Sequence, residues 1–460
     1  MILRQFFLFG VAAAFIAVLS TSYIYFVQPT FKYLGLVYHP APLEFRFVSW
    51  IVALLPLVWV KSKIERPSQC AYWLLYITVY VPSIIMPYLV LNQEPTPILG
   101  LTLGMFAAFL ILWTFCNLPS LNVPPLRLRP ATFYTLIFTF CVLTVLGVFA
   151  IYGVKLSPPS LADIYDVRSE FKTTAETSNP IGGYLVQWLI YSVAPLLFSF
   201  GLAYRKRTLV LLSFLAMWVI YCTLGSKTSF LLLPLAFAII KVVGTDGRNF
   251  GLKMLGAATL VLLVTMTIDS FSGTKMVTGI ISMRMLHVPG ILSAYYFDFF
   301  SHNPTLGLSE SFLKYFVRNP YGVRTPNLMG FEYFGDSNIF SNVHVWGEAF
   351  GNFGYAGIFV FTVILGSLFW LYDSLTLHID GRVPFFLFVI QSFGFANSGL
   401  FTTLLTGGFL INLGITYLFR SAWLSNPNFL RVSRLPEPRW FDLLGERMLS
   451  FGNLTRSITG

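Results

Sequence analysis

A polar segment interrupts a chain that is otherwise a succession of apolar stretches; it begins FSGTKMVTGIISMRMLHVPG at residues 271–290 and ends HVWGEAFGNFG at residues 344–354. Basic, acidic and histidine side chains are concentrated in it, whereas the flanking stretches have few. Long polar inserts between structural helices usually carry function, because the rest of the chain serves to hold them. We therefore expect residues 272–353 to form the catalytic or binding region.

The composition outside this segment predicts an all-α polytopic membrane protein. The chain has 460 residues, of which 56% are hydrophobic and only 11% charged. A bilayer core needs about 20 apolar residues per helix, and lipid-exposed backbone must be hydrogen-bonded within its own helix. On this basis we expect about twelve transmembrane helices, at residues 5–27, 45–60, 69–91, 98–117, 131–153, 184–203, 209–224, 229–243, 254–271, 354–372, 384–398 and 403–419.

The basic residues predict the orientation of these helices. The net charge is +11, and alternate short loops carry the Lys and Arg residues. The positive-inside rule places those loops and both termini in the cytoplasm. Two long, partly helical loops, 154–183 and 272–353, then face the periplasm. The chain divides into helices one to nine (1–271, with the loop at 154–183), the large loop (272–353), helices ten to twelve (354–420) and a basic cytoplasmic tail (421–460). No basic helix or aromatic stacking motif indicates a nucleic-acid partner.

Local patterns predict structure inside the large loop. Residues 276–288 have a helical pattern that we expect to end at Pro289. Residues 309–316 predict a short helix capped by Ser309, with Phe312, Tyr315 and Phe316 on one face. The aromatic run at residues 295–300 is typical of helices in the lipid headgroup region.

Several common chemistries have no support in the sequence. The four cysteines lie inside apolar stretches without CxxC spacing, and no HExxH, DxD, GxSxG or GxGxxG motif is present. Gly225-Ser-Lys-Thr228 resembles the end of a P-loop but lacks its earlier glycine. We therefore expect neither a metal nor a cofactor. Charged residues within the spans are scarce, which disfavours an ion-coupled transporter.

Cationic side chains in the outward loops suggest a phosphate-binding site. Arginine and lysine side chains bind phosphate oxygens, arginine in a bidentate manner. A lipid-linked pyrophosphate would lie at the depth of these loops, with its tail in the bilayer. The alternative is that each cation pairs with lipid headgroups or with Asp166, Glu170 or Glu310. The candidate pyrophosphate-binding residues are Arg168, Lys172, Lys227, Arg284, Arg318 and Arg324.

A second candidate group follows at the end of the large loop. If this stretch is helical, His344 and Glu348 lie four residues apart on one face. Either could act as a general base on a sugar hydroxyl, with Arg284 as the third catalytic candidate. The pair could equally be structural and orient the start of the helix. Tyr295, Trp346 and Asp336 are candidates for glycan binding.

The chain resembles the O-antigen (Wzy-type) polymerase family in these motifs. The resemblance rests on Trp346-Gly-Glu-Ala-Phe-Gly-Asn-Phe-Gly-Tyr-Ala-Gly357, Gly225-Ser-Lys227 and Arg284-Met-Leu-His-Val-Pro289, together with two long loops after the fifth and ninth spans. It implies a metal-independent membrane glycosyltransferase of the GT-C type in the bacterial inner membrane. Such an enzyme transfers a growing glycan from undecaprenyl pyrophosphate to the non-reducing end of a lipid-linked repeat unit on the periplasmic face.

The resemblance also implies partners and residue roles. A flippase and a chain-length regulator would be partners, and Arg168, Arg284 and Lys227 match the family's functional cations. Related O-antigen ligases place a histidine eleven residues before a glycine of the last motif, whereas His344 lies ten before Gly354, which puts its role as base in doubt. The first alternative function is an O-antigen ligase that transfers polysaccharide to lipid A-core. A polysaccharide or lipid-linked sugar transporter is the alternative from another class.

Overall fold

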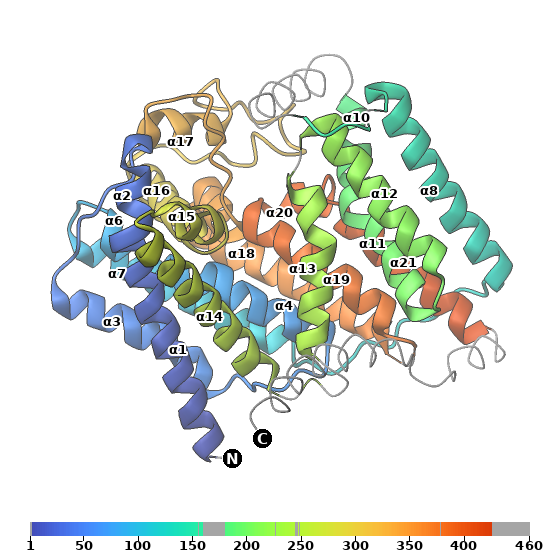
Figure 1. Cartoon of the computed structure of the whole chain (residues 1–460), viewed down its shortest axis with the longest axis horizontal. Helices are drawn as coiled ribbons and strands as arrows, with labels where there is room; N and C mark the ends of the chain where they lie inside the picture. Colours follow the sequence, from blue (N-terminus) through green and yellow to red (C-terminus); the bar gives the residue numbers. More distant parts are fainter. Residues whose placement is uncertain are drawn as a thin grey trace, which may run out of the picture.

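The computed structural model describes residues 2–154, 156–159, 180–225, 227–243, 247, 249–377 and 379–425. Within these ranges the chain is helical and contains no strand, as the composition predicts. In Figure 1 the helices run between two ends of the molecule. The first helix begins at the lower end, and α17 (Thr325–Phe334) lies at the upper end.

Eight helical stretches are long and apolar enough to cross a membrane among the described residues, fewer than the twelve expected. They are Arg4–Leu34, Pro67–Val90, Pro95–Phe115, Pro130–Tyr152, Ile181–Ala203, Arg207–Leu224, Phe250–Ser272 and Val345–Thr376. They contain α1 (Ile2–Ser22), α2 (Gln28–Phe31), η2 (Lys32–Leu34), α4 (Pro67–Leu75), α5 (Val81–Ile85), α6 (Pro87–Val90), α7 (Pro95–Phe115), α8 (Pro130–Tyr152), α10 (Pro180–Trp188), α11 (Ala194–Ala203), α12 (Arg207–Leu224), α14 (Phe250–Ser272) and α18 (Val345–Thr376).

The other four expected spans are helices of fewer than 18 residues. They are α3 (Leu43–Leu54) with the 3-10 turn η3 (Leu55–Val58), α13 (Lys227–Val243), α19 (Arg382–Asn397), and the pair α20 (Leu400–Leu404) and α21 (Phe409–Ser425). The last expected span is thus broken into two pieces. Gly407 and Gly408 lie in the break, and the φ of Gly408 is +76°, a conformation that ends a helix.

In the described part of the chain, four helices contain a π-helical segment, and a proline follows each segment at the second position. The segments are η1 (Tyr23–Val27), η4 (Tyr76–Tyr80), η6 (Leu189–Val193) and η7 (Met283–His287); the prolines are Pro29, Pro82, Pro195 and Pro289. A proline ring clashes with the carbonyl four residues earlier and lacks an N–H. A locally wider turn relieves that clash, so the helix continues.

The large loop is therefore shorter than expected. The chain passes from α15 (Met276–Ser282) through η7 into α16 (Val288–His302), so the expectation that the helix ends at Pro289 is wrong. Most of α16 is buried, including Tyr295, Tyr296 and Phe297, and it packs against α5 and α18. The aromatic run thus belongs to the protein core and not to a headgroup layer. The irregular polar segment starts only after His302.

The helix expected at residues 309–316 is also absent. This stretch consists of successive turns, with Ser311 N–H bonded to Leu308 O and Lys314 N–H to Ser311 O. Leu308 has a φ of +65°, which stops a regular helix from starting there. The exposed Phe312 packs edge-on against Phe401 of α20, with ring centroids 5.1 Å apart.

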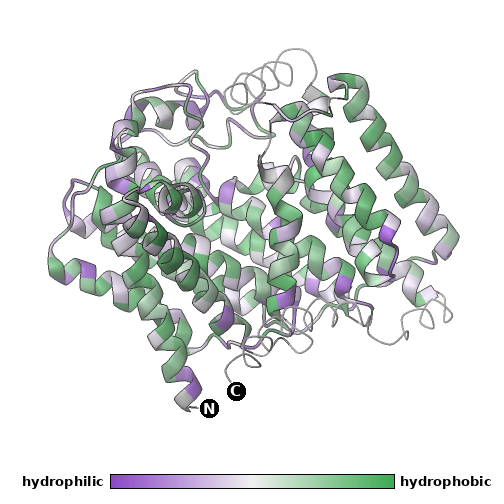
Figure 2. Cartoon of the chain, viewed as in Figure 1, coloured by the Kyte–Doolittle hydropathy of each residue, from purple (hydrophilic) through white to green (hydrophobic). Residues whose placement is uncertain are grey.

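Connecting segments that carry basic residues meet at one end of the molecule. Arg66 Nη1 donates to Leu118 O at 2.7 Å, and Arg420 Nη1 donates to Val123 O at 2.5 Å. Ile64 N–H donates to the carbonyl of Gly247 at 3.2 Å. Figure 2 shows apolar residues along the helices and polar residues gathered towards the two ends. The basic loops that the sequence assigns to one side of a membrane thus share one end of the fold.

Candidate functional site: a junction of interrupted helices

At the other end, the polar loop docks onto an interruption in α18. Phe353 and Gly354 have non-helical backbone angles, and Gly354 has φ +59° and ψ −142°. Leu306 N–H bonds to Gly351 O at 3.0 Å, and Gly307 N–H bonds to Asn352 O at 3.2 Å. These donors satisfy carbonyls that the break leaves without helical partners. The loop therefore fixes the first eight residues of α18, residues 345–352.

Glu348 lies in these first eight residues of α18, and its side chain reaches the short helix α20. Its Oε2 accepts a hydrogen bond of 2.8 Å from the backbone N–H of Leu400, the first residue of α20. Its Oε1 has no hydrogen-bond partner among the described residues, and the side chain is half-buried. A Cβ built on Gly399 would lie 1.9 Å from Oε1, so the carboxylate lies directly against that glycine. We call Glu348, Gly399 and Leu400 the Glu348 junction.

Two further residues lie close to the junction. Burial raises the pKa of Tyr296, and the negative charges of Glu310 and Glu348 raise it further. Electrostatic effects of this kind require both carboxylates to lie near the tyrosine ring. Glu310 Oε1 accepts hydrogen bonds from Thr325 N–H at 2.7 Å and Thr325 Oγ1 at 2.8 Å, which caps the start of α17. Glu310 thereby joins the polar loop to α17 beside the junction.

Hydrogen bonds also hold the α20–α21 break in place. Gln391 Nε2 donates to Tyr191 O at 3.2 Å and to Gly407 O at 3.0 Å. Asn412 Nδ2 donates to the same Tyr191 carbonyl at 3.0 Å. Tyr191 lies in the π-helical segment η6. The π-turn thus supplies a shared acceptor that positions α20, and with it the N–H that binds Glu348.

His344 is placed differently from the expectation that it shares a helical face with Glu348. It is the N-cap of α18, with φ −68° and ψ 172°, and is fully buried. Its Nδ1 accepts from the N–H groups of Trp346 and Gly347, both at 3.2 Å. Because Nδ1 is an acceptor, the proton of the neutral ring lies on Nε2, which is 3.0 Å from Ser83 Oγ. Both ring nitrogens are thus engaged, as in the structural alternative.

Two of the candidate glycan-binding residues are core residues. Trp346 is 1% exposed, packs against Phe109 and donates its indole N–H to Thr362 Oγ1 at 2.8 Å. Tyr295 is 3% exposed and stacks on Tyr333 with ring centroids 4.1 Å apart. Both rings are packed in the core of this structure, and their expected roles in sugar binding stay predictions. Asp336 is exposed and accepts from the backbone N–H of Asn338, so its role remains a prediction.

The candidate cations differ in how far the structure describes them. Arg168 and Lys172 lie outside the described residues, as does the side chain of Lys227 at the start of α13. Arg284, in η7, and Arg318 and Arg324, in the polar loop, have exposed side chains. Arg324 immediately precedes Thr325, the residue bonded to Glu310. Diphosphate binding by these cations remains a prediction.

The sequence alone did not identify Glu310, Gly399 or Leu400 as parts of a site. A signal for the last two exists, since the eleventh and twelfth expected spans are short and only residues 399–402 separate them. Glu310 gives no comparable signal, because its partner Thr325 lies 15 residues away. Among the described residues, no three His, Cys, Asp or Glu side chains gather as metal ligands would. No family model, curated protein or solved structure matches this chain.

Proposed function

We propose that the chain is a membrane glycosyltransferase of the O-antigen polymerase type, which extends a glycan carried on a lipid diphosphate. The observation that carries the proposal is the Glu348 carboxylate, with one oxygen held by the Leu400 N–H and the other without a hydrogen-bond partner in the described part of the chain. A carboxylate positioned in this way is suited to accept a proton from a hydroxyl group bound beside it. The motif resemblance supplies the substrate class, undecaprenyl-pyrophosphate-linked oligosaccharide.

In the proposed reaction, the free oxygen of Glu348 removes the proton from the attacking hydroxyl of a lipid-linked repeat unit. The oxygen of that hydroxyl bonds to the anomeric carbon of the growing glycan, while the bond from this carbon to the diphosphate oxygen breaks. Undecaprenyl pyrophosphate leaves with the bonding electron pair. Cationic side chains near the loop would stabilise its charge, and Arg284, Arg318 and Arg324 are the described candidates. Arg168, Lys172 and Lys227 complete the proposed set.

The position of the basic loops supports the proposed orientation. They gather at one end of the fold, and the Glu348 junction belongs to the segments at the other end. If positive loops face the cytoplasm, the junction faces the periplasm of a bacterial inner membrane. Lipid-linked repeat units would reach that side through a flippase, and a chain-length regulator would act on the product. A ligase that uses the same donor but a lipid A-core acceptor is the alternative within this class.

The test uses purified protein reconstituted with a synthetic lipid-linked repeat unit, with products separated by gel. We expect the wild type to form a ladder and Glu348→Gln to lower its yield at least about 100-fold, as expected for loss of a general base. Glu332→Gln is the matched control, since Glu332 is an exposed glutamate on α17. A normal ladder from folded Glu348→Gln would refute the role of Glu348. Transfer to lipid A-core alone would indicate a ligase.

A transporter is the second candidate, because two helices are interrupted near a half-buried carboxylate. Discontinuous helices of this kind form substrate and ion sites in secondary transporters. The breaks are those at Gly354 in α18 and between α20 and α21. The same vesicles separate the two functions. A transporter moves the lipid-linked saccharide across the bilayer without lengthening it, whereas the enzyme lengthens it without a second membrane component.

A further inference from the structure

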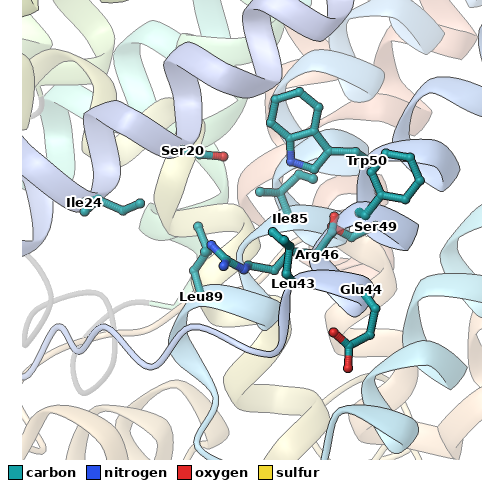
Figure 3. A pocket seen from close by; sticks show the side chains of 10 residues that line it. Ser20, Ile24, Leu43, Glu44, Arg46, Ser49, Trp50, Ile85 and Leu89 are labelled. Atoms are coloured by element: carbon teal, nitrogen blue, oxygen red, sulfur yellow. The ribbon is translucent and has the colours of Figure 1, made fainter.

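The structure contains a groove whose lining includes no residue of the Glu348 junction. It has a volume of about 770 Å³ and is formed by α1, α3, α5 and α6. Its lining includes Leu43, Arg46, Phe47, Trp50, Ile85 and Leu89 (Figure 3). None of the residues assigned above to catalysis or substrate binding lines it. The groove is therefore a separate feature that the proposed reaction does not use.

The rim of the groove is apolar and exposed. Leu43 is 71% exposed and Phe47 is 65% exposed, both on α3. In a protein that crosses a membrane, side chains of this kind on an outer helix contact lipid chains. The inner wall is buried, since Ile85 is only 2% exposed. Hydrocarbon chains from the bilayer can thus enter the groove and cover its apolar lining.

One cation, Arg46, lies in this apolar setting, and its Nε has no hydrogen-bond partner among the residues that the structure describes. Arg46 is half-buried, and this Nε is shielded from solvent. Figure 3 shows its side chain extending towards Leu89, while Glu44 points away from it. No carboxylate among the described residues forms an ion pair with Arg46. A buried N–H of a charged group is unfavourable unless an acceptor binds it, and an anionic ligand would supply one.

We propose that the groove binds a glycerophospholipid of the surrounding bilayer, with its phosphodiester on Arg46 and an acyl chain against Phe47, Trp50 and Ile85. A phosphodiester carries a single negative charge, which one guanidinium balances. Arg46 is the one cation among the described residues that line the groove, and Glu44 points away from it. A lipid diphosphate has more negative charge and would need further cations here. The site is thus independent of the proposed glycosyl transfer.

The test measures lipid binding to the full-length protein in a neutral detergent by native mass spectrometry. The probe is dioleoylphosphatidylethanolamine, and dioleoylglycerol is its analogue without phosphate. We expect the phospholipid to bind more tightly than dioleoylglycerol, and Arg46→Gln to weaken phospholipid binding by about tenfold, the effect of losing one charged hydrogen-bonding group. Arg46→Lys keeps the charge and should retain most of the binding.

The control is Arg129→Gln, which makes the same charge change at an exposed arginine before α8. It should bind the phospholipid like the wild type. Equal binding of dioleoylglycerol and the phospholipid would overturn the proposal, as would unchanged binding in Arg46→Gln. Displacement of the phospholipid by an equal concentration of undecaprenyl phosphate would also overturn it and assign the groove to a polyprenyl lipid. Comparable thermal stability of the variants shows that loss of binding is not loss of fold.

Discussion

The carboxylate of Glu348 accepts the backbone N–H of Leu400 at 2.8 Å across 52 positions of sequence. The contact joins the first eight residues of α18 to the short helix α20. The break in α18 follows at Phe353 and Gly354, and α20 ends at Leu404. An ordinary surface glutamate would be free to rotate. Here the N–H and the adjoining Gly399 fix the carboxylate, and such positioning is what a general base requires.

Gly399→Ala is predicted to displace this carboxylate without unfolding the protein. The new Cβ would lie 1.9 Å from Glu348 Oε1, and the flexible end of that side chain can move away. We expect a loss of about 1–3 kcal/mol in the free energy of unfolding and a roughly 100-fold loss of glycan elongation, the effect of a misplacement near 1 Å. Thermal unfolding and the ladder assay measure the two effects.

The matched control is Gly414→Ala in α21, where a Cβ meets no atom within 4 Å. This variant should keep full elongation activity, because the added Cβ displaces no neighbouring atom. It should also keep its stability, since alanine favours the helix more than glycine does. Full activity in Gly399→Ala would show that the position of the carboxylate does not matter.

Substitutions of His344 are predicted to change stability more than chemistry. His344→Ala removes the acceptor for the Trp346 and Gly347 N–H groups and leaves Ser83 without its partner. We expect a loss of about 2–4 kcal/mol from the lost cap and the buried polar groups. His344→Asn should recover part of it, since asparagine is a good N-cap. Elongation per folded molecule should fall less than tenfold in both variants, as judged by ladder yield normalised to folded protein.

A different pattern would restore His344 as the base. It would be a fall of 100-fold or so in activity per folded molecule, with the unfolding temperature of His344→Asn unchanged.

Gly354→Ala tests whether the break in α18 is needed. Gly354 has φ +59° and ψ −142°, a region that residues with a Cβ rarely adopt, and nothing lies within 4 Å of the added Cβ. The penalty is therefore conformational, about 1–3 kcal/mol. A helix that straightens here would pull residues 345–352 away from the polar loop, so elongation should fall together with stability.

The comparison variant is Gly381→Ala, since Gly381 has φ −72° and an equally open Cβ position. Its unfolding temperature should stay near that of the wild type. Equal effects of the two substitutions would mean that the backbone at Gly354 is not strained by a side chain.

The sequence predicts the membrane helices better than it predicts their interruptions. Hydropathy marks long spans such as Pro130–Tyr152, because burial in lipid depends on composition alone. The proline at position 289 also predicts a helix end, but a π-turn lets the helix continue there instead. That outcome depends on tertiary packing: Gly290 lies so close to α5 that a Cβ on it would be 2.3 Å from Pro82 O.

In the candidate site, too, local sequence patterns predict some residues, whereas the contacts between distant segments depend on the fold. Glu348 is predicted because an acidic residue beside a histidine at the end of a polar segment is a local pattern. The partner that fixes it, the Leu400 N–H, is a backbone group whose role depends on the fold. The sequence suggests sugar binding by Trp346 and Tyr295 because aromatic rings suit that role. Hydropathy cannot distinguish a ring in the core, where the structure places both, from one at a surface.

The last prediction concerns His287, which links η7 to α1. Its Nε2 is 3.0 Å from Ser22 Oγ, and its Nδ1 is 3.2 Å from Ser282 O. Burial lowers the pKa of His287 to about 4, and its effect outweighs the carbonyls of Leu19 and Ser282, which favour the protonated ring. The unfolded chain has the ordinary histidine pKa near 6.5. The unfolded state therefore binds the proton more readily than the folded state between pH 6.5 and 4.

Folding is consequently favoured above pH 6.5 and loses stability as the pH falls from 6.5 towards 4. The shift of about 2.5 pKa units corresponds to a loss of roughly 3 kcal/mol over that range. We expect unfolding of the detergent-solubilised wild type to show this pH dependence, and His287→Gln to be less stable at pH 7 but to lose less on acidification. The difference between the two curves isolates His287 from other titrating groups. Parallel curves from pH 7 to pH 4 would contradict the prediction, because they would show that His287 has the same pKa in the folded and unfolded states.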